Sequence, residues 1–307
     1  MAPFIALAAM ISWCSSAALG KEPPAFHIVG YLPDYRVADF NAESAKYLTD
    51  LVYFSAEPTA DGALKRDRLR NDQLGALQAI KSRHGVALLL TVGGWERSAG
   101  FAEMAALETT RARFAVNARQ FCLEEHFDGI DLDWEHPADD EQRKNYDRLI
   151  TAMKREFQTH ELQLTVAIAA WQVLSPEAIA AVDRVHLMAY DNEGRHATFD
   201  DATSAVQRLL KAGVPAAKIC LGVPFYGREV RQGGRSLTYA EIVRKYSPAA
   251  DTDEVDGFYF NGPGTIARKT RFARAGKLGG IMIWELGQDI ADERSLLEVV
   301  AGASRQP

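Results

Sequence analysis

Eight short apolar runs, rich in β-branched and aromatic residues, recur along the chain and constrain its fold more than any other feature. Most of the runs are apolar on both faces, which is typical of parallel strands covered by helices and not of half-exposed antiparallel strands. They occupy residues 27–32, 50–56, 86–94, 129–135, 162–170, 184–190, 219–227 and 279–286.

The segments between these runs have the period of amphipathic helices. Leu74, Leu77 and Ile80, for example, share one face of a helix that we expect to end at Gly85. Eight strand–helix units in one alternating series predict an α/β protein, a single (β/α)8 barrel. A doubly wound open sheet is the alternative, but no GxGxxG or phosphate-binding loop follows any of the runs.

The connection between the seventh and eighth runs is the longest. It contains the stretch DGFYFNGPG at residues 256–264, and Thr238 and Glu241 within it have the spacing of a capping box. We expect a small insertion over the barrel mouth here. No proline- or serine-rich linker divides the chain, so we predict one barrel domain over residues 21–307.

Residues 1–20 contain no charged side chain. An apolar run from Phe4 to Ile11 is followed by small residues, and Ala18-Leu19-Gly20 resembles a signal-peptidase site. We therefore predict a signal peptide over residues 1–20 and a secreted or periplasmic protein. The run has no basic start, which leaves a buried N-terminus as the alternative. Serines interrupt it well short of the roughly 20 apolar residues that a membrane span needs.

The overall charge and the cysteines exclude further classes of function. The formal net charge is −6 with both signs mixed along the chain, and no basic stripe exists that would bind nucleic acid. Cys122 and Cys220 lie far apart and do not have the spacing of metal ligands. We expect them to be buried free thiols, although an exported protein could join them, and we expect a monomer.

The fourth run, DGIDLDWE, places three acids at every second position. Residues two apart on a strand share a face, so Asp131, Asp133 and Glu135 point into the barrel while Trp134 packs toward the helices. Glu135 comes last, at the carboxyl-terminal mouth where barrel active sites lie. Acids about 7 Å apart on this face raise each other's pKa, and a carboxyl group that is protonated near neutral pH can act as a general acid.

Two other interpretations of the acidic run are less well supported by the residues around it. A solvent-facing acidic edge would have polar neighbours, but these acids alternate with core-type side chains. A divalent metal site would draw ligands from several elements, and no histidine-rich partner set is visible. We expect no metal and no cofactor.

The position of Glu135 bears on glycosidic bond cleavage. A retaining glycosidase with a protein nucleophile needs a second carboxylate about 5–5.5 Å away across the sugar. Asp131 and Asp133 lie beneath Glu135 on the same strand and are on the wrong side for that role. The substrate can supply the nucleophile itself, through a 2-acetamido group that Asp133 orients.

DGIDLDWE at residues 128–135 resembles the DGxDxDxE signature of glycoside hydrolase family 18, the chitinase family. Further blocks agree in order along the chain, with Thr91 in place of the usual serine. They are VGYLPDY (29–35), TVGGW (91–95), MAYD (188–191) and GGIMIWELGQD (279–289).

The resemblance implies roles for individual residues. Glu135 is the general acid and then the base, Asp133 positions the acetamide, Asp131 tunes Asp133, and Tyr190 donates its hydroxyl to the acetamide carbonyl. Met188, Asp191 and Trp284 form the subsite of the distorted sugar. Further candidates for sugar contact at strand ends are Tyr31, Trp95, Trp171, Tyr226 and Arg228.

The implied activity is retaining hydrolysis of β-1,4-N-acetylglucosamine linkages in chitin or chitooligosaccharides, without metal. One alternative is a lectin-like barrel that binds chitooligosaccharides without cleaving them, but such relatives typically lack the acid that Glu135 supplies here. The other is an endo-β-N-acetylglucosaminidase that acts on N-glycans or peptidoglycan.

Overall fold

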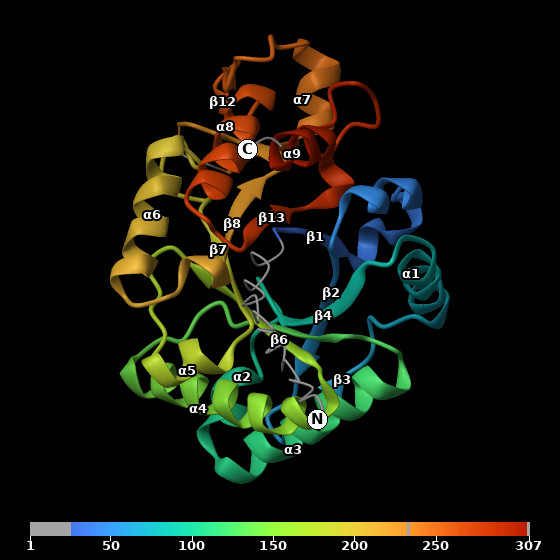
Figure 1. Cartoon of the computed structure of the whole chain (residues 1–307), viewed down its shortest axis with the longest axis vertical. Helices are drawn as coiled ribbons and strands as arrows, with labels where there is room; N and C mark the ends of the chain where they lie inside the picture. Colours follow the sequence, from blue (N-terminus) through green and yellow to red (C-terminus); the bar gives the residue numbers. More distant parts are fainter. Residues whose placement is uncertain (1–25, 232–233, 306–307) are drawn as a thin grey trace, which may run out of the picture.

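The computed structural model describes residues 26–231 and 234–305, and it confirms the predicted (β/α)8 barrel. Eight parallel strands form the wall, which closes because β1 pairs with both β2 and β13 (Figure 1). The proposed signal peptide, residues 1–20, lies outside the described residues. The barrel strands are β1 (His27–Pro33), β2 (Asp50–Pro58), β4 (Ala87–Gly93), β5 (Gly129–Asp133), β6 (Gln163–Ala169), β7 (Arg184–Met188), β8 (Ile219–Pro224) and β13 (Gly280–Trp284).

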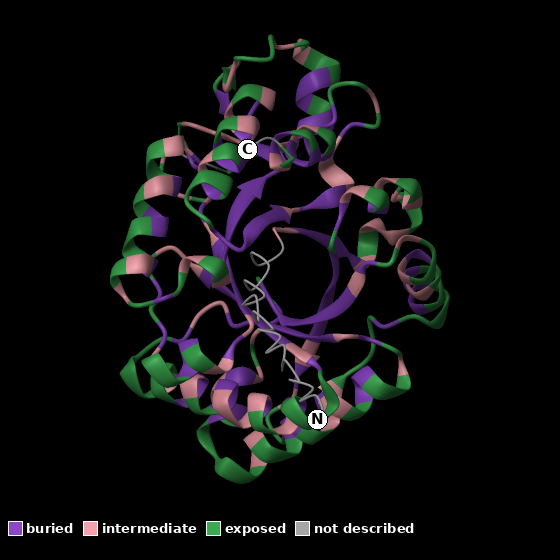
Figure 2. Cartoon of the chain, viewed as in Figure 1, coloured by how far each residue is buried: buried purple, intermediate pink, exposed green. Residues whose placement is uncertain are grey.

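Helices cover the outside of this wall and turn their apolar faces to it (Figure 2). The predicted end of the first helix is confirmed, because Gly85 ends α1 in a left-handed conformation. Ser175 caps the start of α5 ahead of Pro176. The α-helices are α1 (Asn71–His84), α2 (Phe101–Ala106), α3 (Glu108–Glu124), α4 (Asp140–Phe157), α5 (Pro176–Ala181), α6 (Phe199–Lys211), α7 (Tyr239–Tyr246), α8 (Pro263–Ala275) and α9 (Leu296–Ser304). The 3-10 turns are η1 (Asp34–Asp39), η2 (Ala42–Tyr47), η3 (Gln158–His160), η4 (Ala216–Lys218) and η5 (Leu286–Gln288), and β3 (Leu64–Lys65) pairs with the end of β2.

The insertion between the seventh and eighth barrel strands is a small antiparallel sheet with one helix, α7, packed at its edge. The sheet has the order β10-β9-β12-β11, and the predicted capping box at Thr238 and Glu241 starts α7. The strands are β9 (Tyr226–Glu229), β10 (Ser236–Thr238), β11 (Glu254–Val255) and β12 (Phe258–Tyr259). The run expected at 219–227 thus breaks after Pro224, where the chain leaves the barrel for this sheet.

Two apolar clusters lie on the two sides of the barrel wall. The larger one fills the space between strands and helices and includes Cys122 and Trp134, which stacks on Phe101 with ring centroids 5.2 Å apart. The smaller one lies inside the barrel and includes Cys220. Because the wall separates Cys122 from Cys220, both are buried free thiols, as expected.

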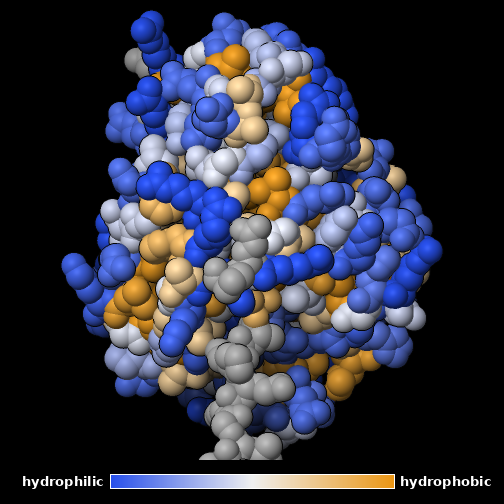
Figure 3. All heavy atoms as spheres, turned by 45° about the horizontal axis from the view of Figure 1, so that its top comes forward, coloured by the Kyte–Doolittle hydropathy of each residue, from blue (hydrophilic) through white to orange (hydrophobic). Residues whose placement is uncertain are grey.

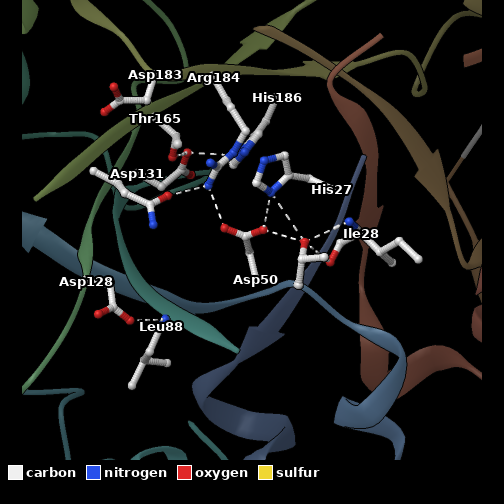
Figure 4. A network of polar contacts seen from close by, with 12 residues as sticks. His27, Ile28, Asp50, Leu88, Asp128, Asp131, Thr165, Asp183, Arg184 and His186 are labelled. Carbon is white, nitrogen blue, oxygen red and sulfur yellow. Dashed lines mark hydrogen bonds and ion pairs between the residues drawn. The ribbon is translucent and has the colours of Figure 1, made fainter. Parts of the chain in front are cut away.

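An ion-pair network closes the amino-terminal end of the barrel (Figure 4). Asp50 and Arg184 begin β2 and β7, and the Arg184 Nη2 lies 2.6 Å from Asp50 Oδ1. His27 Nδ1 lies 2.8 Å from the other oxygen of the Asp50 carboxyl group. Burial alone would raise the pKa of Asp50, but the contacts with His27 and Arg184 outweigh it and lower that pKa. The interior is therefore sealed at this end by paired charges.

The surface has no large apolar face in the view of Figure 3, where hydrophobic side chains form separate small areas among hydrophilic ones. Within residues 26–231 and 234–305, no helix combines the length and apolar character needed to cross a bilayer.

Candidate functional site

A cleft of about 630 Å³ opens at the carboxyl-terminal ends of the barrel strands. It collects almost every residue that the sequence singled out, from six barrel strands or the segments after them and from the insertion. The predicted residues that line it are Tyr31, Trp95, Asp133, Glu135, Trp171, Met188, Tyr190, Asp191, Tyr226, Arg228 and Trp284.

Asp131 is the exception, because it lies beneath the cleft inside the barrel and is fully buried. The strand register places Thr91 and Thr165 beside it on β4 and β6. Thr165 donates to its carboxyl group at 2.6 Å, Tyr31 donates at 2.7 Å, and His186 Nδ1 lies 3.1 Å away. This carboxyl group is thus held by contacts from β1, β6 and β7, and Figure 4 shows it with Thr165 and His186.

Asp133 lies one step higher on the same face and has far fewer partners. It is 3% exposed, and among the described residues its Oδ1 has no hydrogen-bond partner. Burial, and then the charges of Glu135 and Asp131, raise its pKa well above the ordinary value. Asp133 can therefore hold a proton at neutral pH and has an oxygen free for a ligand.

Glu135 was predicted as the last residue of its strand, and this was wrong, because β5 ends at Asp133. Its backbone N–H instead bonds the Ser98 hydroxyl at 3.1 Å, which holds the segment after the strand in place. The side chain still reaches the cleft. Burial, and then the charge of Asp191, raise its pKa to about 7, which suits a general acid at neutral pH.

The glycines of TVGGW allow the chain to pass close to these acids. Gly93 and Gly94 both have positive φ, and a Cβ on Gly93 would lie 2.3 Å from the Asp133 carbonyl oxygen. The Gly94 N–H bonds that same carbonyl at 2.6 Å. Only glycine tolerates this conformation and this close approach together.

An aromatic floor lies beside the acids. Trp284, at the end of β13, packs edge-on against Phe54 with ring centroids 4.7 Å apart and tilts against Tyr31 at 5.7 Å. Among the described residues, the one hydrogen-bond partner of the Tyr190 hydroxyl is the Met282 sulfur at 3.8 Å. Burial, and then Asp133, raise the pKa of Tyr190, so its hydroxyl stays protonated and can donate to a ligand.

Asp191 is held by residues of the insertion. Its Oδ1 accepts a hydrogen bond from the Tyr226 hydroxyl at 2.7 Å and lies 2.8 Å from Arg228 Nη1. His196 Nδ1 lies 3.6 Å from the same oxygen. Burial by itself would raise the pKa of Asp191, but the contacts with His196, Arg228 and Tyr226 outweigh it and lower that pKa to about 2.

Two tryptophans stand at the rim of the cleft on either side of Glu135. Trp95 follows β4 and is 69% exposed, and Trp171 follows β6 and is 55% exposed. Large aromatic rings left in solvent at a cleft suit stacking against the apolar face of a sugar.

Several cleft residues escaped the sequence analysis. Some lie within predicted strands or quoted motifs, but none was singled out there and most are neutral, so only the folded position shows that they line the site. They are His136, Ala167, Ala169, Ala170, Asn192, Gly234, Ser236, Met282 and Gln288. In the part of the chain that the structure describes, no three His, Cys, Asp or Glu residues converge as a metal site would require.

Comparison with known proteins agrees with this geometry. The family model described as "Glycosyl hydrolases family 18" matches residues 27–289. The chain is 28% identical over 277 residues to "Probable chitinase 2" of Drosophila melanogaster, an alignment that takes in 68% of this chain and 57% of that protein. The chain therefore spans a little over half the length of that relative.

Solved structures share the whole fold. The family 18 chitinase ChiB from the chitin utilization locus of Flavobacterium johnsoniae superposes with a TM-score of 0.82 at 29% identity, covering 92% of this chain and 94% of that one. A chitinase-like agglutinin from Robinia pseudoacacia shares the fold at 23% identity, with a TM-score of 0.77 over 90% of this chain and 99% of that one.

Proposed function

The chain belongs to glycosyl hydrolases family 18, and from that premise we propose that it hydrolyses β-1,4-N-acetylglucosamine linkages of chitin or chitooligosaccharides. One observation carries the proposal. Glu135 lies in an aromatic-floored cleft with a pKa raised to about 7, directly above the buried Asp133. A protonated acid beside a site for a sugar ring is what cleavage of a glycosidic bond requires.

The other carboxyl groups of the cleft favour a nucleophile that comes from the substrate. Among the described lining residues, Asp133, Glu135 and Asp191 are the ones that carry a carboxyl group. Asp133 is buried, and Asp191 is engaged by Arg228 and Tyr226. We therefore propose that the 2-acetamido oxygen of the bound sugar attacks its own anomeric carbon.

The reaction then runs in two balanced steps. Glu135 gives its proton to the glycosidic oxygen, the bond from that oxygen to the anomeric carbon breaks, and the acetamide oxygen bonds that carbon. The Asp133 carboxyl group accepts the acetamide N–H, and the Tyr190 hydroxyl donates to the acetamide oxygen. Water then gives a proton to Glu135 and its hydroxyl to the anomeric carbon, which restores the acetamide with overall retention.

The remaining predicted residues supply binding. Trp284 forms the floor for the distorted sugar, and Met188 and Asp191 form its sides. Tyr31, Tyr226 and Arg228 both fix these side chains and line the cleft, and Trp95 and Trp171 stack on sugars at the rim. Asp131, held by Tyr31 and Thr165, lies under Asp133, and its charge helps to raise the pKa of Asp133.

The proposal can be tested by incubating the protein with chitotetraose or chitopentaose and following the products and their anomers by NMR. The wild type should release β-anomers first, and Glu135→Gln should cut kcat by at least about a hundredfold because it removes the transferable proton. Glu193→Gln is the matched control, because Glu193 is exposed and does not line the cleft. EDTA should not change the rate.

The outcomes separate the proposed function from its alternatives. Binding of the oligosaccharides without turnover would identify a lectin. Turnover of a glycopeptide or of peptidoglycan but not of chitin oligomers would assign the other branch of substrates. Export is a separate proposal, and its test is the N-terminal sequence of the secreted protein, which should start near Lys21.

A further inference from the structure

His136 is the residue next to the proposed acid, and its side chain lines the same cleft. Its Nε2 lies 3.5 Å from Glu135 Oε2, and the histidine side chain is 27% exposed. Hydrogen bonds in unliganded active sites are often long and shorten when substrate binds. The imidazole is therefore within reach of one oxygen of the acid.

The histidine ring is fixed by the segment after β6. It meets Trp171 edge-on, with ring centroids 5.0 Å apart at 66°. The turn that carries Trp171 is itself closed by the Gln172 side chain, whose Oε1 accepts the Ala169 N–H at 2.6 Å. A ring held in this way presents a fixed nitrogen to Glu135.

The second nitrogen of the ring limits where its proton can lie. Among the described residues, His136 Nδ1 is buried without a hydrogen-bond partner. A proton on Nδ1 would be a buried donor without an acceptor among the described residues. The neutral form with its proton on Nε2 avoids this penalty.

We propose that His136 is a positioning residue, whose Nε2–H donates to Glu135 Oε2 and so leaves Oε1 to carry the proton to the glycosidic oxygen. This inference rests on the proposed function. When Glu135 gives up its proton and becomes a carboxylate, the same N–H stabilises the new charge. His136 exchanges no proton, since the one that Glu135 loses comes back from water.

Burial favours a neutral imidazole, although acids surround the pair. Glu135 faces Asp133 and Asp191, and Arg228 pairs with Asp191. Burial lowers the pKa of His136. The contact with the neutral amide of Gln172 offsets part of this lowering. Burial thus favours the uncharged form of His136 as well as that of Glu135.

Two substitutions separate the hydrogen bond from the shape of the ring. His136→Phe keeps the contact with Trp171 and removes the donor, whereas His136→Gln returns an N–H near the position of Nε2. On chitotetraose, His136→Phe should lower kcat about tenfold and leave KM within about twofold, as expected for a hydrogen bond to a charged group. His136→Gln should recover most of the loss.

The pH profile supplies a readout that a packing defect would not move. The Nε2–H stabilises the carboxylate form of Glu135, so its removal should raise the pKa of that residue. The basic limb of the kcat profile should then move up by about one pH unit in His136→Phe. With a 4-nitrophenyl leaving group, which needs little protonation, the loss of kcat should shrink to about threefold or less.

Distinct results would overturn this inference and the proposed function. The inference fails if a folded His136→Phe keeps the wild-type kcat and basic limb, or if His136→Gln is as impaired as His136→Phe. Thermal unfolding of each variant verifies that it is folded. The proposed function itself fails if the wild type turns over none of the oligosaccharides, or if Glu135→Gln keeps the full rate.

Discussion

Replacing Glu135 by glutamine should stabilise the protein, and by an amount that depends on pH. Burial raises the pKa of Glu135 from 4.5 to about 7, so the folded protein binds this proton more tightly than the unfolded chain does. Stability from this group is complete below about pH 4.5 and is lost as the pH rises through 7. Glutamine has nearly the same shape and carries no charge at any pH.

The size of this stabilisation follows from the pKa values of Glu135 in the unfolded and the folded protein. The interval from 4.5 to about 7, at about 1.4 kcal/mol per pH unit, gives about 3.5 kcal/mol at pH 8.5. Solvent at the 15% of the side chain that stays exposed makes this an upper figure. At pH 4 wild type and variant both carry an uncharged side chain here, so the difference in the free energy of unfolding should vanish.

This difference in the free energy of unfolding can be measured by urea unfolding and thermal melts at pH 4 and pH 8.5. The proteins compared are the wild type, Glu135→Gln and the exposed control Glu193→Gln. A gain of 3 kcal/mol corresponds to a rise in Tm of about 6 °C for a domain of this size. If Glu135→Gln is no more stable than wild type at pH 8.5, or gains equally at both pH values, the carboxylate is not destabilised by burial. The assignment of Glu135 as the acid would then lose its physical basis.

Three further predictions concern the rest of the fold. Arg184→Met should lower the free energy of unfolding by about 3 kcal/mol at pH 7 in urea titrations, since it leaves the buried carboxylate of Asp50 without its cation. Cys122 and Cys220 should resist a thiol reagent in native buffer and react in urea, because burial raises the pKa of both thiols. Thr238→Ala removes the cap of α7 and should cost about 1 kcal/mol in the same titration.

The barrel could be predicted from sequence because each strand and helix has its own local pattern. The stripe of Leu74, Leu77 and Ile80 on α1, its end at Gly85 and the cap at Thr238 depend only on residues a few positions apart. The antiparallel sheet of the insertion could not be predicted, because strands of two to four residues are too short to show alternation.

The site was only partly predictable for a related reason. The acids and the aromatic floor could be predicted from sequence motifs. The residues that surround them are set by the register in which the barrel strands pair. Asp131 is held by Tyr31 and Thr165, which are 100 and 34 residues away in the chain, and that pairing exists only once the barrel closes. His136 and Ser236 have no pattern that marks them, so their places in the cleft emerge from the fold alone.

The contacts between the insertion and Asp191 have a consequence for how such barrels can diverge in evolution. Tyr226 and Arg228 lie on β9, outside the barrel, yet they neutralise a carboxyl group of the segment that follows β7. The insertion is therefore not an exchangeable accessory. A graft from another barrel that lacked this tyrosine and arginine would leave the Asp191 carboxylate beside Glu135 without its cation and with His196 as its remaining contact, so the two parts must evolve together.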